Sequence, residues 1–457
     1  MSQGRSAETW PPSGRDPRAA PNGHVFARGR DLPFAVRAEG SVVWDADGRR
    51  YLDAAGGAIV VGIGHGDAGV AAAMAEQAAL LAYAHGTKFT SEPLERYVAE
   101  VATLLPMDDA RIYPVSGGSE AVETALKMAR SYHLARGDDE RNVIIGREGS
   151  YHGNTLGALD ASGRRSLRTP YAPWLGRAVH VPAPYEYRCP APSHPQACGA
   201  WHAEVLDRRI RDIGPGRVAC FIAEPVVGAT LAAAVPTDDY WPAVSEVCRS
   251  HGVLLIADEV MTGFGRTGRW FAAEHWGLRP DILTAAKGAS SGYWPLGFAA
   301  CTGEVFETIA RGGFVHGFTY SHSAVGAAVG LAVLERLRDR ELVKASEVKG
   351  DRLRSQLGGA LSGHPHVGDI RGLGLMIGIE LVRDRESREP FPRGDQLAER
   401  VLSAAKEDGL LLYPSTGCAD GIDGDAVMLG PPFVITEAEM EEAASKTATA
   451  IERVTGG

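Results

Sequence analysis

The residues VLLIADEVMTGFGRTG at 253–268 and DILTAAKGAS at 281–290 decide the fold of this chain. Each segment contains a short apolar run, Val253–Ala257 and Ile282–Thr284, which is typical of a strand buried in a parallel sheet. The first run ends at Asp258, and Lys287 follows the second. Because α/β sheets bind ligands at the carboxyl ends of their strands, we expect both side chains at one edge of a sheet.

The α/β pattern extends from these strands over the middle of the chain. Further apolar runs at 142–145, 218–222 and 298–301 alternate with helical periodicities at 119–135 and 239–250. We therefore predict an α/β fold whose large domain is a mostly parallel sheet covered by helices.

The two ends of the chain differ from the middle. Residues 34–52 predict a hairpin, and the last third predicts helices at 342–361, 395–408 and 436–454 with strands at 376–381 and 426–429. We expect both ends to form one smaller α+β domain. The predicted division is a flexible arm at 1–33, the first part of the small domain at 34–70, the large domain at 71–330 and the C-terminal part of the small domain at 331–457.

Composition argues against several classes of protein. Lys and Arg number 47 against 57 Asp and Glu, a formal charge of −10, which makes a nucleic-acid or anionic-membrane surface improbable. No uninterrupted apolar run reaches the ~18 residues of a membrane span. The N-terminus has no apolar signal segment, so we expect a cytoplasmic protein.

Six cysteines are spread over the chain, and four lie in or beside apolar stretches, which predicts free thiols. Residues 184–202 form a Pro/Cys-rich insertion that contains Cys189, His194, Cys198 and His202. Their spacing matches none of the common zinc patterns. We therefore predict a surface loop there and no metal.

Lys287 and Asp258 carry the predicted chemistry. The small neighbours of Lys287 leave room for a bulky group on its Nζ, and a partly desolvated lysine readily forms a Schiff base. The Asp258 carboxylate could hold a proton on a heterocyclic nitrogen. A surface lysine in a turn and an aspartate that caps the next turn are the structural alternatives.

Two glycine-rich segments are candidate phosphate sites. Gly263–Gly268 matches G-x-G-x-x-G, but it does not directly follow its strand and no helix is predicted to open inside it, which argues against a dinucleotide site. At Gly117, Gly118 and Ser119 a helix begins, and its first N–H groups and a hydroxyl suit one phosphate. A helix that simply starts at glycines is the alternative.

A phosphate cradle, an acid for a ring nitrogen and a lysine for an aldehyde are the three groups that hold pyridoxal 5′-phosphate (PLP). At these residues the chain resembles the class III aminotransferases, PLP enzymes of fold type I, from about Phe34 to the C-terminus. The resemblance implies a large domain with a seven-stranded type of sheet. It rests on Leu52-Asp53 with GIGHG at 62–66, SGGSEAVETALKMAR at 116–130, Tyr151-His152-Gly153, AEP at 223–225, ADEVMTGFGRTG at 257–268, AAKG at 285–288, HGFTYS at 316–321 and RGLGL at 371–375.

The resemblance also implies the roles of individual residues. Lys287 would form the internal aldimine with PLP and then act as general acid/base, and Asp258 would pair with the ring nitrogen. Thr319 would reach the phosphate of a neighbouring subunit, which implies a homodimer or a dimer-based tetramer. The remaining implied cofactor contacts are Gly117, Gly118 and Ser119 at the phosphate, Tyr151 and Val260 on the two ring faces, and His152 and Glu224 in the supporting network.

The implied reaction is ping-pong transfer of a primary, ω-type amino group from an amine or amino acid to pyruvate or a similar 2-oxo acid. A PLP decarboxylase, aminomutase or epimerase on the same scaffold would share every motif. A nicotinamide oxidoreductase and a binding protein that keeps the fold without catalysis are the alternatives from other classes.

The substrate pocket departs from the family pattern. Tyr413 stands where many amine:pyruvate members carry an arginine for the acceptor carboxylate, and Ile59 or a neighbour replaces a pocket tryptophan. Lys88 lies in a stretch that lines the entrance in the family, where it could receive an anionic group of the substrate or simply be solvated. Trp294 could narrow the site or only pack, and Tyr151 is a further candidate substrate contact. Two motif arginines, Arg266 and Arg371, are expected to orient structure rather than bind substrate.

Overall fold

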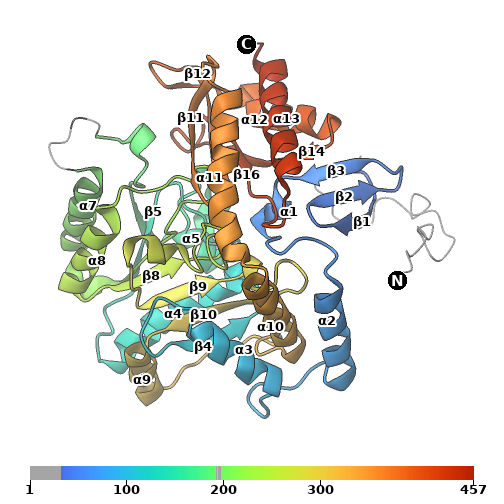
Figure 1. The fold of residues 1–457 in the computed structure, drawn as a ribbon. Helices are drawn as coiled ribbons and strands as arrows, with labels where there is room; N and C mark the ends of the chain where they lie inside the picture. The colour runs from blue at the N-terminus through green and yellow to red at the C-terminus, as the bar shows by residue number, and fades with distance from the viewer. Residues whose placement is uncertain (1–31, 192, 194–196, 457) are drawn as a thin grey trace.

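A seven-stranded sheet forms the centre of the molecule (Figure 1). The computed structural model describes residues 32–191, 193 and 197–456. Strand β10 runs antiparallel to both of its neighbours, and every other neighbouring pair is parallel, so the predicted mostly parallel sheet is confirmed. In spatial order the strands are β4 (Arg111–Val115), β10 (Gly297–Cys301), β9 (Ile282–Ala285), β8 (Leu254–Asp258), β7 (Val218–Ala223), β5 (Val143–Arg147) and β6 (Ala178–Val181).

Helices cover both faces of this sheet, which explains why its inner strands are apolar on both sides. Along β7, Ile222 packs with α4 (Gly118–Ala135) and α9 (Gly303–Gly312), whereas Phe221 packs with α7 (Cys198–Ile213) and α8 (Tyr240–His251). Successive side chains of a strand point to opposite faces, so one apolar run serves two cores.

The two ends of the chain meet in a second sheet. Strands β1 (Ala35–Glu39), β2 (Val42–Asp45) and β3 (Arg50–Asp53) form the N-terminal hairpin region, and β14 (Leu410–Leu411) pairs parallel to β3. The expected joint construction from both termini is therefore present in this sheet. The division at 34–70, 71–330 and 331–457 stays a prediction, and residues 1–31 of the predicted arm lie outside the described residues.

The C-terminal third adds another antiparallel sheet with helices beside it (Figure 1). Its strands are β11 (Val367–Leu373), β12 (Met376–Asp384), β16 (Asp425–Leu429) and β15 (Tyr413–Thr416), with β13 (Glu389–Pro390) beside β12. Its helices are α11 (Leu342–Ala360), α12 (Leu397–Glu407) and α13 (Glu437–Thr455).

Several elements escaped the sequence analysis. Helix α2 (Ala68–Leu80) is rich in alanine and has no apolar stripe to reveal it, although it packs against α10 (Ala324–Asp339), as α3 (Glu92–Ala102) does. Strands β4 and β6 and helices α7 and α9 were also not predicted. The remaining α-helices of the described residues are the short α1 (Gly56–Ile59), α5 (Leu156–Ala161) and α6 (Arg165–Arg168).

The expected surface loop at 184–202 needs a correction at its end. Cys198 and His202 belong to helix α7, which begins at Cys198, and Glu186–Arg188 form the short 3₁₀ turn η3. The prolines at 190, 192 and 195 concealed this helix start, because proline-rich sequence predicts a loop.

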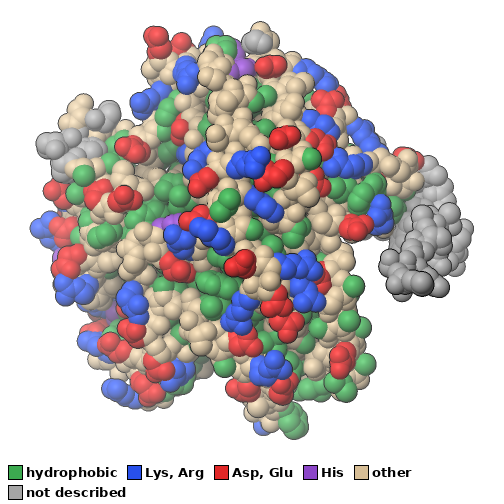
Figure 2. Space-filling view, viewed as in Figure 1, with side chains coloured by type: hydrophobic (Ala, Val, Ile, Leu, Met, Phe, Trp, Pro, Cys, Tyr) green, Lys and Arg blue, Asp and Glu red, His purple; other side chains and the backbone are tan. Residues whose placement is uncertain are grey.

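The surface carries both signs of charge. Figure 2 shows Lys and Arg interspersed with Asp and Glu over the visible face. Within the described residues, no helix is both long enough and apolar enough to cross a bilayer.

Candidate active site

A cavity of about 430 Å³ opens at the carboxyl ends of β8 and β9, next to the start of α4. This is where the sequence predicted a ligand site, because parallel strands end there at one edge of the sheet. The cavity brings together residues from six separate segments of the chain. The cavity-lining residues that the sequence analysis had already named are Gly117, Gly118, Ser119, Tyr151, His152, Glu224, Asp258, Val260, Lys287 and Trp294.

Lys287 enters the cavity just after β9, as the first residue of the short 3₁₀ turn η6 (Lys287–Ala289). Its φ of +44° lies in the left-handed region, a conformation that costs a non-glycine residue about 1 kcal/mol or more. Desolvation lowers the pKa of Lys287 to about 8. At pH 7 roughly a tenth of this amine is therefore neutral, on the order of 100-fold more than for an ordinary lysine, and the neutral form is the one that acts as a nucleophile or proton acceptor.

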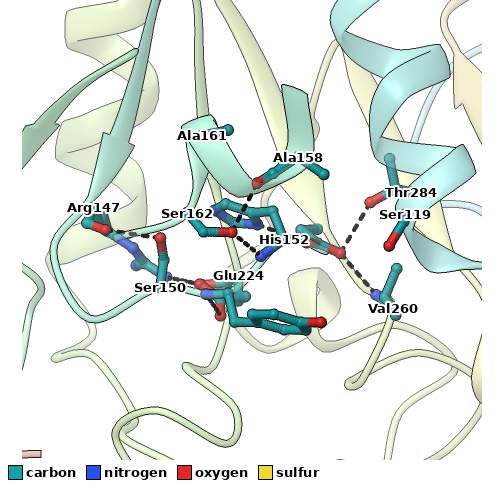
Figure 3. A network of polar contacts seen from close by, with 12 residues as sticks. Ser119, Arg147, Ser150, His152, Ala158, Ala161, Ser162, Glu224, Val260 and Thr284 are labelled. Atoms are coloured by element: carbon teal, nitrogen blue, oxygen red, sulfur yellow. Dashed lines mark hydrogen bonds and ion pairs between the residues drawn. The ribbon is translucent and has the colours of Figure 1, made fainter. Parts of the chain in front are cut away.

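Asp258 is the last residue of β8 and is held by three residues that Figure 3 labels, His152, Thr284 and Val260. His152 Nδ1 lies 2.7 Å from Oδ2, whereas Oδ1 accepts hydrogen bonds from Thr284 Oγ1 at 3.0 Å and from the Val260 backbone N–H at 3.1 Å. Thr284 sits opposite Asp258 in the β8–β9 ladder, so the pairing register supplies that contact. The carboxylate is buried and fixed in one orientation.

Glu224 is held by an arginine that the sequence analysis missed. Arg147 Nη2 donates to Glu224 Oε2 at 3.2 Å, and the Tyr151 backbone N–H donates to Oε1 at 3.2 Å (Figure 3). Arg147 is fully buried, with its guanidinium over the ring of Trp241. Arg147 is the last residue of β5. The expectation that ligand sites form at the carboxyl ends of parallel strands, which led to Asp258, could therefore also have led to Arg147.

The start of α4 leaves space for an anion. A Cβ added to Gly117 would meet no atom within 4 Å, whereas one added to Gly118 would lie 2.8 Å from Val260 Cγ1. Ser119 Oγ accepts from the Asn154 backbone N–H at 3.0 Å, so its own proton is available for another acceptor. The first N–H groups of a helix have no partner inside it, so those of α4 suit one phosphate.

Two predicted substrate residues lie elsewhere. Ile59 is buried in the core against Gly430, and its neighbour Val60 lines the cavity, so Val60 replaces Ile59 as the pocket residue. The positive φ of Ile59, +56°, turns the chain at this point, which explains why Val60 and not Ile59 lines the cavity. Lys88 is exposed and is not among the residues that line the cavity.

Tyr413 begins β15 and does not line the cavity itself, but it lies near a second arginine that the sequence analysis missed. This is Arg164, whose guanidinium interacts electrostatically with the hydroxyls of Tyr413 and Tyr151. Its Nη2 donates to Thr416 Oγ1 at 3.2 Å, and its Nε is buried without a partner among the described residues. Burial lowers the pKa of Arg164.

The motif arginines are structural, as expected. Arg266 is fully buried and donates to the carbonyl oxygens of Leu375, Pro431 and Val61 at 2.7–3.1 Å, tying the C-terminal third and the N-terminal region to the large sheet. Arg371 pairs with Asp369. No helix opens inside Gly263–Gly268, which removes the structural context that a dinucleotide site requires.

Thr319 is exposed and does not line the cavity of its own chain. Exposed apolar side chains occur near Thr319, at residues 315–320, and again at residues 80–89. The two segments touch, since Tyr83 packs edge to face against Tyr320 at 6.5 Å between ring centroids. Val315, Tyr320, Leu80 and Phe89 each expose 70% or more of their surface. Clustered exposure of this kind is typical of a protein interface.

The groups around the cavity fit PLP: a phosphate cradle at the start of α4, the Asp258 carboxylate for the ring nitrogen and the Lys287 amine for the aldehyde. Together with the seven-stranded, mostly parallel sheet, they define a PLP-dependent enzyme of fold type I.

Comparisons with known proteins refine this class. The family profile described as Aminotransferase class-III matches residues 25–451. The chain is 40% identical over 426 residues to an uncharacterized aminotransferase of Bacillus subtilis, a match covering 92% of this chain and 96% of that protein. It is 34% identical over 410 residues to the putrescine–pyruvate aminotransferase of Pseudomonas aeruginosa, covering 89% and 88%.

Among solved structures, an amine transaminase from an uncultivated Pseudomonas species in its PLP-bound form superposes with a TM-score of 0.86 at 33% identity, covering 95% of this chain and 98% of that one. The protein belongs to the class III aminotransferases and is a PLP-dependent transaminase.

Proposed function

We propose that this aminotransferase moves a primary, ω-type amino group from an amine or amino acid to pyruvate or a similar 2-oxo acid by a ping-pong reaction. The observation that carries the proposal is the low-pKa amine of Lys287 in one cavity with the fixed carboxylate of Asp258. The similarity to a putrescine–pyruvate aminotransferase and to an amine transaminase supports a donor whose amino group is primary.

Bound PLP supplies an electron sink for the charge that develops when the substrate carbon loses a proton. In this proposal Lys287 Nζ would accept that proton and return it. Asp258 would hold a proton on the ring nitrogen, and His152, Thr284 and the Val260 N–H keep the Asp258 carboxylate in place. Glu224 and Arg147 fix the backbone at Tyr151, which borders the cavity.

We also propose that Arg164 binds the carboxylate of the 2-oxo acid, in the role that Tyr413 cannot fill. A half-buried guanidinium with a buried, unpartnered Nε is costly unless a ligand completes its hydrogen bonds, and carboxylates do this well. Arg164 lies near the hydroxyls of Tyr413 and Tyr151, and Tyr151 lines the cavity.

We propose further that the active unit is a homodimer in which Thr319 completes the phosphate site of the neighbouring subunit. The exposed apolar side chains at 80–89 and 315–320 support this arrangement. The dimer-based tetramer expected as an alternative would contain the same pair.

The two half-reactions test the proposed activity separately. With purified holoenzyme, a primary amine alone should bleach the visible absorbance of bound PLP and release one carbonyl product per active site, and pyruvate should then restore the absorbance and yield alanine. Lys287→Ala is the control, since its absorbance should not respond to amine in this way. Carbon dioxide release, or isomerisation without an acceptor, would instead identify a decarboxylase, aminomutase or epimerase on this scaffold.

A further inference from the structure

Three side chains of types that bind metals lie close together outside the active-site cavity. They are Cys189, which precedes α7, and Cys198 and His202, which lie in the first turns of that helix. Their ligand atoms all lie within 4.8 Å of one another, and the two Sγ atoms are 3.8 Å apart. From this arrangement we infer that the protein binds a structural zinc ion at Cys189, Cys198 and His202.

The geometry of the two sulfurs suits a shared zinc ion. Thiolates about 2.3 Å from a tetrahedral zinc are separated by about 3.8 Å, close to the observed Sγ–Sγ distance. A disulfide requires about 2.05 Å, so Cys189 and Cys198 are not bonded to each other.

Helix α7 explains how two of the ligands align. Cys198 and His202 are four residues apart, so they share one face of the helix. His202 is buried and its ring is held edge-on against Trp201 at 4.7 Å between centroids. Cys189 approaches this face from the end of the short turn η3 (Glu186–Arg188), whose 3₁₀ geometry puts Cys189 and Glu186 on one side.

Charge balance also favours a divalent cation. A cysteine thiol loses its proton when it binds zinc as a thiolate. Zinc binding would therefore release the protons of the two thiols to solvent, and two thiolates with a neutral imidazole would then cancel the charge of the ion. Glu186, whose charge acts on Cys198, or a water molecule would complete the tetrahedron.

Such a site would fasten the segment around Tyr187 and Arg188, which reaches across to the C-terminal third. Arg188 pairs with Glu380 of β12 and donates to the carbonyl oxygen of Arg388 at 2.8 Å. Zinc would therefore stabilise this contact between distant parts of the chain rather than take part in transamination.

Metal analysis of holoenzyme purified without a metal-binding tag tests the inference. We expect roughly one zinc ion per chain in the wild type and in Cys301→Ser, a control on β10, and loss of the metal from the Cys189→Ser/Cys198→Ser double variant. Cobalt(II) added to zinc-stripped protein should give thiolate-to-cobalt absorption in the wild type only. Glu186→Gln separates the two choices for the fourth ligand.

Wild-type protein alone also decides the matter if the double variant does not fold. A metal-free chain that takes up neither zinc nor cobalt overturns the inference, and so does a chain two hydrogens lighter than its sequence requires, because it contains a disulfide. Zinc retained unchanged in a folded double variant would place the ion elsewhere.

Discussion

The imidazole of His152 and the carboxylate of Asp258 lie 2.7 Å apart between Nδ1 and Oδ2, and both side chains are buried at the edge of the central sheet. This contact fixes the orientation of an acid that lines the same cavity as Lys287. His152 therefore acts on the proposed reaction through Asp258.

Replacing His152 with alanine should lower kcat/KM on the order of 10-fold while the protein stays folded, because Thr284 and the Val260 N–H still hold the other carboxylate oxygen. Asp258→Asn, which keeps the shape and removes the charge, should cost on the order of 10²-fold or more. Steady-state kinetics with one amine and pyruvate measure both. His180→Gln on β6 is the control, and an equal loss there would show that the effect of His152 is not specific.

The amine of Lys287 should control how fast cofactor-free protein captures PLP. Only the neutral amine attacks the aldehyde, and desolvation lowers the pKa of Lys287 to about 8. The capture rate should therefore level off above this pH and fall about tenfold per pH unit below it. Stopped-flow absorbance measures the profile, and a midpoint near the ordinary lysine value would contradict it. Asp258→Asn should move the midpoint further down, because the Asp258 charge raises this pKa.

Two adjacent glycines should respond differently to alanine. Gly118→Ala forces a Cβ to within 2.8 Å of Val260 Cγ1, so it should lower both the thermal midpoint of the cofactor-free protein and its affinity for PLP. Gly117→Ala meets no protein atom within 4 Å and has extended backbone, so it should weaken PLP binding alone. Equilibrium titration with PLP and thermal unfolding without it separate the two effects. Identical behaviour of the variants would argue against a phosphate cradle at Gly117.

Arg164→Gln should raise the KM for 2-oxo acids on the order of 10- to 100-fold and leave the KM of donors without a carboxylate unchanged. The reason is that only the acceptor has an anionic group for the guanidinium. The neighbouring exposed Arg165→Gln is the matched control. If donors and acceptors weaken equally in Arg164→Gln, the residue supports the structure and does not bind the carboxylate.

Mixed dimers test the role of Thr319 across an interface. Thr319→Asp should repel the phosphate and Lys287→Ala should remove the reactive amine, so each homodimer should have little activity. A heterodimer of the two variants would contain one site with both native residues, and mixing should restore up to about half of the activity per dimer. Absence of recovery in a heterodimer verified by native mass spectrometry would show that Thr319 does not act in its partner's site.

The sequence by itself determined the α/β pattern and the principal groups of the site. Apolar runs predict strands that are buried on both faces, and the residues that follow these runs lie at the edge of the sheet where ligands bind. Asp258 and Lys287 could therefore be predicted from the sequence. Helix α4 begins within one residue of its predicted start because an 18-residue amphipathic helix after two glycines carries a strong local signal. The alanine-rich α2 carries no such signal.

Only the tertiary structure decided which distant side chains meet. Arg147 reaches Glu224 and Arg164 comes close to Tyr413, each across long stretches of sequence, and no local periodicity encodes such contacts. Val60 rather than Ile59 borders the cavity because one residue with positive φ turns the chain there. Likewise Cys189 joins Cys198 and His202 because a helix starts where prolines predicted a loop. Local pattern fixes burial and element type, whereas side-chain partners depend on how the elements pack against one another.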